Sequence, residues 1–144
     1  MVKDLFNFEA EFKLGIEAID QEHLKLVNML NAVHRLVSDG KKTEAIEYFS
    51  LTLANYVGSH FAHEEAFMAS FGYPQLEEHA QIHKNFKKSF MQSLPKLASY
   101  DETAFRAALT DAFTWIINHI GRTDRKYAKF YLAQSKGEPA QPIG

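Results

Sequence analysis

Four segments of the sequence repeat apolar residues every three or four positions, and Gly or Pro residues separate the segments. The separators are the Asp-Gly pair at 39–40, the Gly-Tyr-Pro sequence at 72–74 and a loose stretch around Pro95. A spacing of three or four follows the turn of an α-helix, whereas no stretch alternates apolar and polar residues as a β-strand does. Gly and Pro commonly follow the last turn of a helix. The pattern therefore predicts an all-α protein.

The first three predicted helices span about 19–38, 43–70 and 75–94, and the fourth begins after Asp101, its predicted N-cap. Short links between amphipathic helices favour neighbours that run in opposite directions. We therefore expect one up-down-up-down four-helix bundle, in a domain over residues 1–135. Residues 136–144 are predicted to be a flexible tail. Apolar residues ahead of the first helix predict an N-terminal arm that packs on the bundle, formed by Leu5, Phe6, Phe8 and Phe12.

The composition excludes several classes of function. With 144 residues, 46% of them hydrophobic, the chain suits a single domain with a substantial core. A net charge of -2 provides no basic field for nucleic acid or an anionic membrane, and no apolar run reaches the roughly 20 residues that span a bilayer. Cysteine is absent, which excludes disulfides, thiolate catalysis and cysteine-bound metals. Acidic residues near the N-terminus, where a secretory signal is apolar, lead us to expect a cytoplasmic protein.

Ionisable residues interrupt the apolar face of every predicted helix. Each lies three or four positions from an apolar residue of the same face, so each is predicted to point into the bundle. Burying such a group without a partner is costly, and so many on facing helices need a partner in common. A metal ion provides one, because imidazole and carboxylate are frequent metal ligands. The interrupting residues are His23 in the first helix, His60 and Glu64 in the second, His79 and His83 in the third, and His119 in the fourth.

The order of the helices brings these six residues to one end of the bundle. They lie near the starts of the first and third helices and near the ends of the second and fourth. In an up-down-up-down bundle, those starts and ends meet. Pairs four residues apart, such as His60 and Glu64, also aim at one region. The sequence therefore predicts a buried metal site at this end.

Asp124 is a further candidate that helical phase alone does not place. It follows His119 by five residues, which is about 140° around an ideal α-helix. A straight helix would not aim both side chains inward. Gly121 lies between them, and its freedom predicts a local break or tightening of the helix. Judged by spacing alone, a surface position is the alternative interpretation for Asp124.

The motifs, taken in order, resemble those of the hemerythrins, and most of all the single-domain bacteriohemerythrins. They are His23, HFAHEE at 60–65, HAQIH at 79–83 and HIGRTD at 119–124, flanked by GIEAIDQEH, FGYP, WIINHI and Tyr127. The resemblance covers about residues 8–131. It departs from the family at Phe8, where tryptophan is frequent, and at His63, which is not a ligand position. It implies two non-haem iron ions with an oxo or hydroxo bridge, and dioxygen as the ligand.

The resemblance also implies a role for each residue. His79, His83 and His119 would hold one iron, and His23 and His60 would hold the other and leave it an open position. Glu64 and Asp124 would bridge the pair. In related proteins, residues at four further matching positions line the oxygen pocket, and ordinary core packing is the alternative interpretation for them. These residues are Phe61, Trp115, Ile116 and Ile120.

A histidine-rich site favours reversible binding of dioxygen over its activation, which carboxylate-rich di-iron bundles perform. We therefore expect a monomeric oxygen-binding protein, not an enzyme, that stores, transports or delivers dioxygen to an oxygen-requiring enzyme. The alternatives are a sensor that acts through a separate partner, peroxide or nitric oxide chemistry at the same irons, and metal storage.

Several other ionisable residues lie near the predicted ligands in the sequence. His34 is three turns from His23, so we expect a partly buried or rim histidine there. His63 is expected to flank the site at the surface. Five acidic residues are expected to be solvated or to orient a ligand imidazole, namely Asp20, Glu22, Glu65, Glu77 and Glu78.

Overall fold

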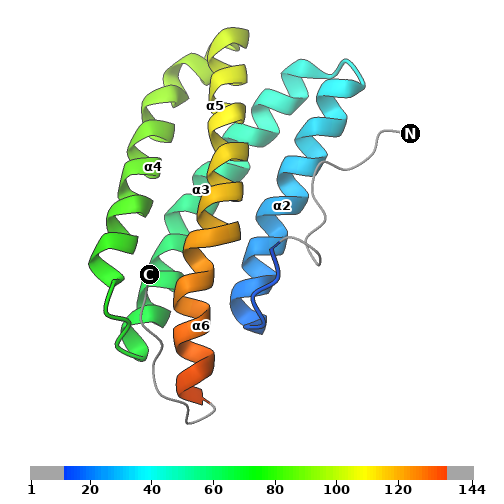
Figure 1. Cartoon of the computed structure of the whole chain (residues 1–144). Coiled ribbons are helices and arrows are strands. Elements are labelled where there is room, and N and C mark those ends of the chain that lie inside the picture. Colours follow the sequence, from blue (N-terminus) through cyan, green and yellow to red (C-terminus); the bar gives the residue numbers. More distant parts are fainter. Residues whose placement is uncertain (1–11, 136–144) are drawn as a thin grey trace.

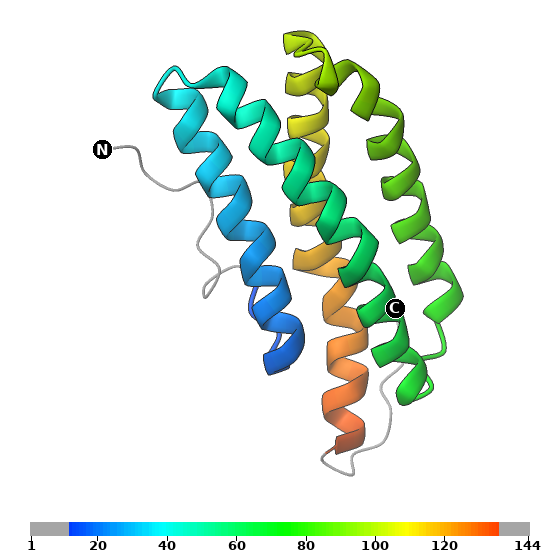
Figure 2. The same ribbon diagram turned by 180° about the vertical axis from the view of Figure 1, so that it is seen from behind.

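The computed structural model describes residues 12–135, and this part of the chain is an all-helical bundle without strands (Figures 1 and 2). The elements are α2 (Glu17–Ser38), α3 (Lys42–Ser70), α4 (Leu76–Ala98), α5 (Glu102–Trp115), the π-helix η1 (Ile116–Thr123) and α6 (Asp124–Ser135). Helix α2 packs on α3, α3 on α4 and α4 on α5, while α5, η1 and α6 follow one another as the fourth rod (Figure 1). The predicted four-helix bundle is confirmed. No helix within 12–135 has the length and apolarity that crossing a bilayer requires.

Of the predicted N-terminal arm, only Phe12 belongs to the described residues. Its side chain is 3% exposed and joins the main core cluster. Leu5, Phe6 and Phe8 lie outside the described residues, as does the predicted tail at 136–144. The packing of the arm and the two domain limits therefore stay predictions.

Helices α2 and α3 end in the same hydrogen-bond pattern. After α2, Gly40 donates to the carbonyl of Val37 and Lys41 donates to that of Leu36. After α3, Gly72 donates to Ala69 and Tyr73 to Met68. Both glycines have positive φ, +77° and +68°, which a residue without Cβ adopts at low cost. The two glycine-containing separators of the sequence therefore end helices, as predicted.

Around Pro95 the prediction was wrong, because α4 continues through this residue to Ala98. A proline cannot donate the backbone hydrogen bond that the turn would otherwise make. Pro95 lies in the last turn of α4 and removes one such bond, while Leu97, two residues further on, is buried to 1% exposure. Burial of this side chain offsets the lost bond. The following helix begins as expected, with the Asp101 carboxylate accepting from the Ala104 N–H at 3.0 Å.

Two apolar clusters fill the bundle, and the ionisable residues lie between them. The larger cluster, with Leu30, Phe49 and Phe105, occupies the end formed by the links α2–α3 and α4–α5. The smaller cluster closes the opposite end with Met68 and Tyr127, beside partly buried aromatic rings of α3 and α6. Side chains at the predicted metal site are thus shielded from solvent on both sides along the bundle axis.

Candidate metal centre

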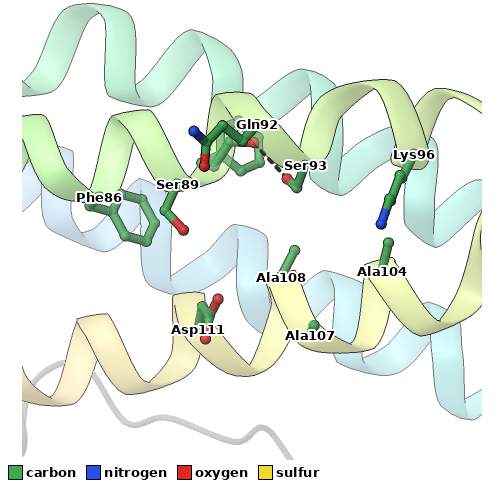
Figure 3. A pocket seen from close by; sticks show the side chains of 10 residues that line it. Phe86, Ser89, Gln92, Ser93, Lys96, Ala104, Ala107, Ala108 and Asp111 are labelled. Atoms are coloured by element: carbon green, nitrogen blue, oxygen red, sulfur yellow. Dashed lines mark hydrogen bonds between the residues drawn. The ribbon is translucent and has the colours of Figure 1, made fainter.

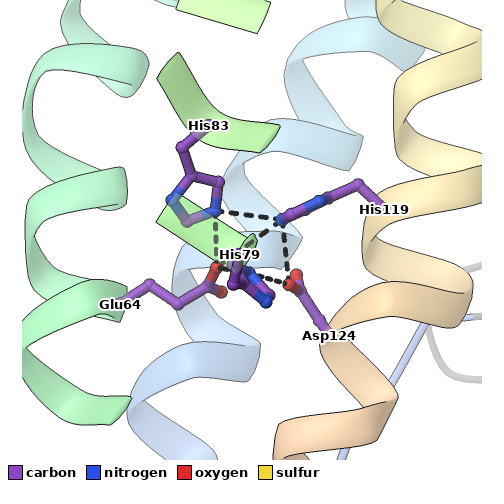
Figure 4. A group of neighbouring side chains, drawn as sticks. All are labelled: Glu64, His79, His83, His119 and Asp124. Carbon is purple, nitrogen blue, oxygen red and sulfur yellow. Dashed lines mark hydrogen bonds and ion pairs between the residues drawn. The ribbon is translucent and has the colours of Figure 1, made fainter. Parts of the chain in front are cut away.

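All seven predicted ligands meet at one end of the bundle, and none is more than 3% exposed. They come from every rod of the bundle, and Figure 4 shows five of them converging from α3, α4 and the fourth rod. Glu64 and Asp124 lie at the centre, because the Nε2 atoms of four imidazoles approach oxygens of one or both carboxylates to 2.9–3.1 Å. His60 Nε2 lies 3.3 Å from Glu64 Oε2. The predicted gathering of these residues is observed, while their role as ligands stays a prediction.

The cluster divides into two unequal groups of donor atoms. In one group the donor atoms of Glu64, Asp124 and three histidines lie within 4.8 Å of one another, and in the other those of Glu64, His23 and His60 do so. Glu64 belongs to both. Asp124 also reaches the second group, since its Oδ2 lies 3.1 Å from His23 Nε2. The histidines of the larger group are His79, His83 and His119.

A π-helix brings Asp124 into the cluster. In η1 the winding widens, and the Asp124 backbone N–H donates to the carbonyl of His119, five residues back. Residues five apart therefore lie on one face, as residues four apart do in an α-helix. The predicted break or tightening is thus a widening. The freedom of Gly121 does not explain it, because its φ is not positive and a Cβ there would meet Phe12 at an ordinary 3.6 Å.

Two glutamates hold imidazoles of the cluster from the side that faces away from its centre. The Nδ1–H of His60 donates to Glu22 Oε1 at 3.1 Å, and that of His83 donates to Glu65 Oε2 at 2.9 Å. Each bond fixes the ring and leaves Nε2 directed at the carboxylates. The second Glu22 oxygen accepts from His63 Nδ1 at 3.0 Å, and the His63 side chain is 65% exposed. Of the open acidic candidates, Glu22 and Glu65 therefore orient imidazoles.

The other open candidates have different roles. Asp20 is 7% exposed and accepts from the backbone N–H groups of Leu14 and Gly15, so it fixes the turn before α2. This contact was not expected from the sequence. Glu77 and Glu78 are exposed, and His34 is partly buried far along α2, as expected.

Aromatic rings pack against the cluster. Phe61 stacks on His83 with centroids 4.1 Å apart and planes 2° apart, and Trp115 stacks on His119 at 4.2 Å and 15°. Ile116 and Ile120 have no exposed surface. The hydroxyl of Tyr127 donates to Glu64 Oε2 at 3.0 Å. Sequence reasoning treated Tyr127 only as a flanking feature, although its spacing of three from Asp124 places it on the same face of α6.

Charges within the cluster shift its pKa values strongly. Burial by itself lowers the pKa of His23, but the neighbouring carboxylates of Asp124 and Glu64 outweigh it and raise the pKa to about 10. The same balance raises the pKa of His79 to about 9. Burial raises the pKa of the two carboxyl groups, but the surrounding imidazoles outweigh it and hold both well below their usual range. Metal binding at these atoms would displace protons from the imidazoles.

The donor set fits a pair of metal ions. Both Asp124 oxygens are buried and accept no hydrogen bond from the described residues, although imidazole nitrogens lie nearby. The Nε2 atoms of His83 and His119 lie 3.0 Å apart, so a single cation could bind both in place of a proton between them. Five imidazoles with two carboxylates, without a thiolate, suit iron and similar transition metals.

Clefts at the surface reach two of the histidines. One between α4 and the fourth rod, about 570 Å³, is lined by Trp115 and His119. It shares Phe86 and Asp111 with a cleft of about 280 Å³ farther from the cluster (Figure 3). Another, about 220 Å³, lies between α2 and α3 and is lined by His60.

Comparisons with known proteins agree with this architecture. The family model Hemerythrin HHE cation binding domain matches residues 14–131. A bacteriohemerythrin of Clostridium acetobutylicum is 34% identical over 127 residues, which are 85% of this chain and 98% of that protein. Hemerythrin subunit beta of Lingula anatina is 31% identical over 81% of this chain and 87% of its own length.

A comparison with solved structures finds hemerythrins as well. A crystal structure of a hemerythrin mutant superposes with a TM-score of 0.76 at 24% identity, over 88% of this chain and 96% of that one. At this identity the likeness concerns the fold alone. The family model, however, covers most of the chain and includes all seven residues of the cluster. The chain therefore belongs to the hemerythrin family.

Proposed function

We propose that this protein binds dioxygen reversibly at two non-haem iron ions, for storage, transport or delivery. The observation that carries the proposal is the unequal division of the buried donor atoms. Three histidines with two carboxylates can saturate one ion, whereas His23 and His60 with the same carboxylates leave a position open on the other. Ferrous iron at this site would supply the electrons that dioxygen takes up on binding and returns on release.

The surroundings of the cluster support reversibility. Phe61, Ile116 and Ile120 are buried hydrocarbons beside the histidines, and we assign them with Trp115 to the oxygen pocket. An apolar wall excludes the water that would promote loss of the bound molecule as a reduced product. Glu22, Glu65 and Tyr127 hold His60, His83 and Glu64 in place. A fixed set of ligands lowers the reorganisation required between the two oxidation states of the ions.

Metal analysis and oxygen titration test the proposal. The purified protein should hold two irons per chain. After anaerobic reduction, added dioxygen should produce an absorption band that disappears when dioxygen is removed, over repeated cycles. A single tightly bound zinc would contradict the di-iron centre. Irreversible oxidation, or turnover of peroxide or nitric oxide, would instead favour an enzyme.

We infer further that the carrier is a cytoplasmic monomer that supplies an oxygen-requiring enzyme. Within residues 12–135, the large apolar side chains that reach the surface are distributed over several helices and are not concentrated on one of them. Examples are Leu24 on α2, Leu51 on α3, Met91 on α4 and Ile117 on η1. Light scattering after size-exclusion chromatography should give the mass of one chain, and a dimer would contradict this inference.

A further inference from the structure

A tyrosine hydroxyl buried beside the cluster has no hydrogen-bond partner among the described residues. Tyr56 lies in α3, one turn before His60, and its ring stacks on that imidazole with centroids 4.6 Å apart and planes 25° apart. Its hydroxyl is buried and unpartnered. Tyr127 provides the contrast, because its hydroxyl donates to Glu64. A buried O–H that has lost water and found no partner costs free energy, so a second binding partner is expected.

Tyr56 lies beside the group of donor atoms that contains His23 and His60, because its ring stacks on His60. One turn from the ligands toward the middle of the bundle, the other helices contribute the hydrocarbon side chains Leu26, Phe86 and Ile116. Among these four positions only Tyr56 carries a hydrogen-bond donor. Trp115 also has a buried N–H without a partner among the described residues, but it stacks on His119. This histidine belongs to the three-histidine group, to which the proposed function assigns no open position.

We propose that the Tyr56 hydroxyl donates a hydrogen bond to the small molecule that binds beside His23 and His60. This rests on the proposed function, since it assumes an open position in that group. A tyrosine carries its proton at neutral pH, so it can serve as a donor. Dioxygen gains negative charge when it binds to reduced metal, and a donor in a dry site stabilises such charge strongly. Tyr56 would therefore raise affinity for dioxygen and for small anions.

The rival partner is a water molecule in the cleft between α2 and α3. That cleft is lined by both Tyr56 and His60, with Glu22 and Leu26 on its α2 side. A water there could accept from the hydroxyl. In that case Tyr56 would be structural and would not contact the bound molecule. The two possibilities differ in what removal of the hydroxyl changes.

The test compares Tyr56→Phe with Tyr48→Phe, an exposed tyrosine on the same helix that serves as the control. Azide is the probe, added to the iron-loaded, oxidised protein. Loss of one hydrogen bond should weaken azide binding roughly 5- to 10-fold in Tyr56→Phe and leave the control unchanged. The infrared azide stretch should shift between H₂O and D₂O in the wild type, and this shift should disappear in Tyr56→Phe.

A second readout uses the protein stripped of metal. There the hydroxyl has no ligand to donate to, so Tyr56→Phe should unfold at the wild-type temperature or above it. A lower unfolding temperature, or azide affinity and stretch equal to those of the wild type, would overturn the proposal in favour of the water. Dioxygen cycling of the wild type is measured separately. Azide held through Tyr56 by a protein that never releases dioxygen would contradict only the proposed function.

Discussion

His119 and Asp124 are five residues apart, yet the His119 Nε2 atom lies 2.9 Å from Asp124 Oδ1. The π-helix η1 makes this contact possible, because its i→i+5 bonding returns the chain to the same face after five residues. An α-helix of the same sequence would turn Asp124 away. A buried carboxylate shared by two groups of histidines thus depends on a single local change in winding. π-Helical turns are rare and occur frequently at functional sites.

This relationship predicts opposite effects for a deletion and an insertion at Gly121. Deleting Gly121 reduces the separation of His119 and Asp124 from five positions to four, which an ordinary α-helix places on one face about 6 Å apart along its axis. Two irons per chain should be retained. Inserting an alanine after Gly121 makes the separation six and should turn Asp124 out of the site, with loss of iron. Metal analysis of both variants checks this, and an insertion variant that keeps two irons would refute it.

Glu64 and His63 are neighbours with opposite expected importance. Glu64 contacts histidines of both groups, so Glu64→Ala should remove most bound iron and take one of two central counter-charges from the buried imidazoles. His63 is 65% exposed and bonds to Glu22 at the edge of the cluster, so His63→Ala should keep two irons. Iron content and circular dichroism together separate loss of the site from loss of the fold. A fully loaded Glu64→Ala protein would argue against the bridging role.

Glu22 should matter for one iron more than for the other. It holds His60, which belongs to the two-histidine group, so Glu22→Ala frees that ring and should lower affinity for one ion about 10- to 100-fold. Competition with a chelator should then release one iron per chain early. Glu77→Ala, at an exposed position of α4, is the matched control. Simultaneous release of both irons would indicate a general loss of stability instead.

Ile116→Ala and Leu30→Ala should separate pocket function from core packing. Both residues are fully buried, and either truncation should cost about 2–5 kcal/mol of stability. Ile116 lies three residues from His119, whereas Leu30 lies two turns from His23. Only Ile116→Ala should admit water and speed oxidation of the oxygenated protein, which absorption spectroscopy can follow. Equal oxidation rates in the two variants would remove Ile116 from the proposed pocket.

The sequence by itself determined the helices, their faces and the end of the bundle at which the ionisable residues meet. Spacing along a helix reports which side chains share a face, and short links report the direction of the next helix. His23 and His119 could therefore be assigned to one site although they lie in the first and the last helix of the bundle. The same reasoning failed at Pro95, where burial of Leu97, two residues further on, outweighed a local helix-breaking signal.

Only the tertiary structure decided the contacts that depend on non-ideal winding or on the facing helix. Asp124 required the π-helix, and the capture of His60 by Glu22 required the packing of α2 on α3. Asp20 likewise turned out to fix a turn and not an imidazole. Helical phase gives the direction of a side chain relative to its own axis, while a contact across the bundle also depends on the rotation and offset of the partner helix, which is set by packing of the whole core.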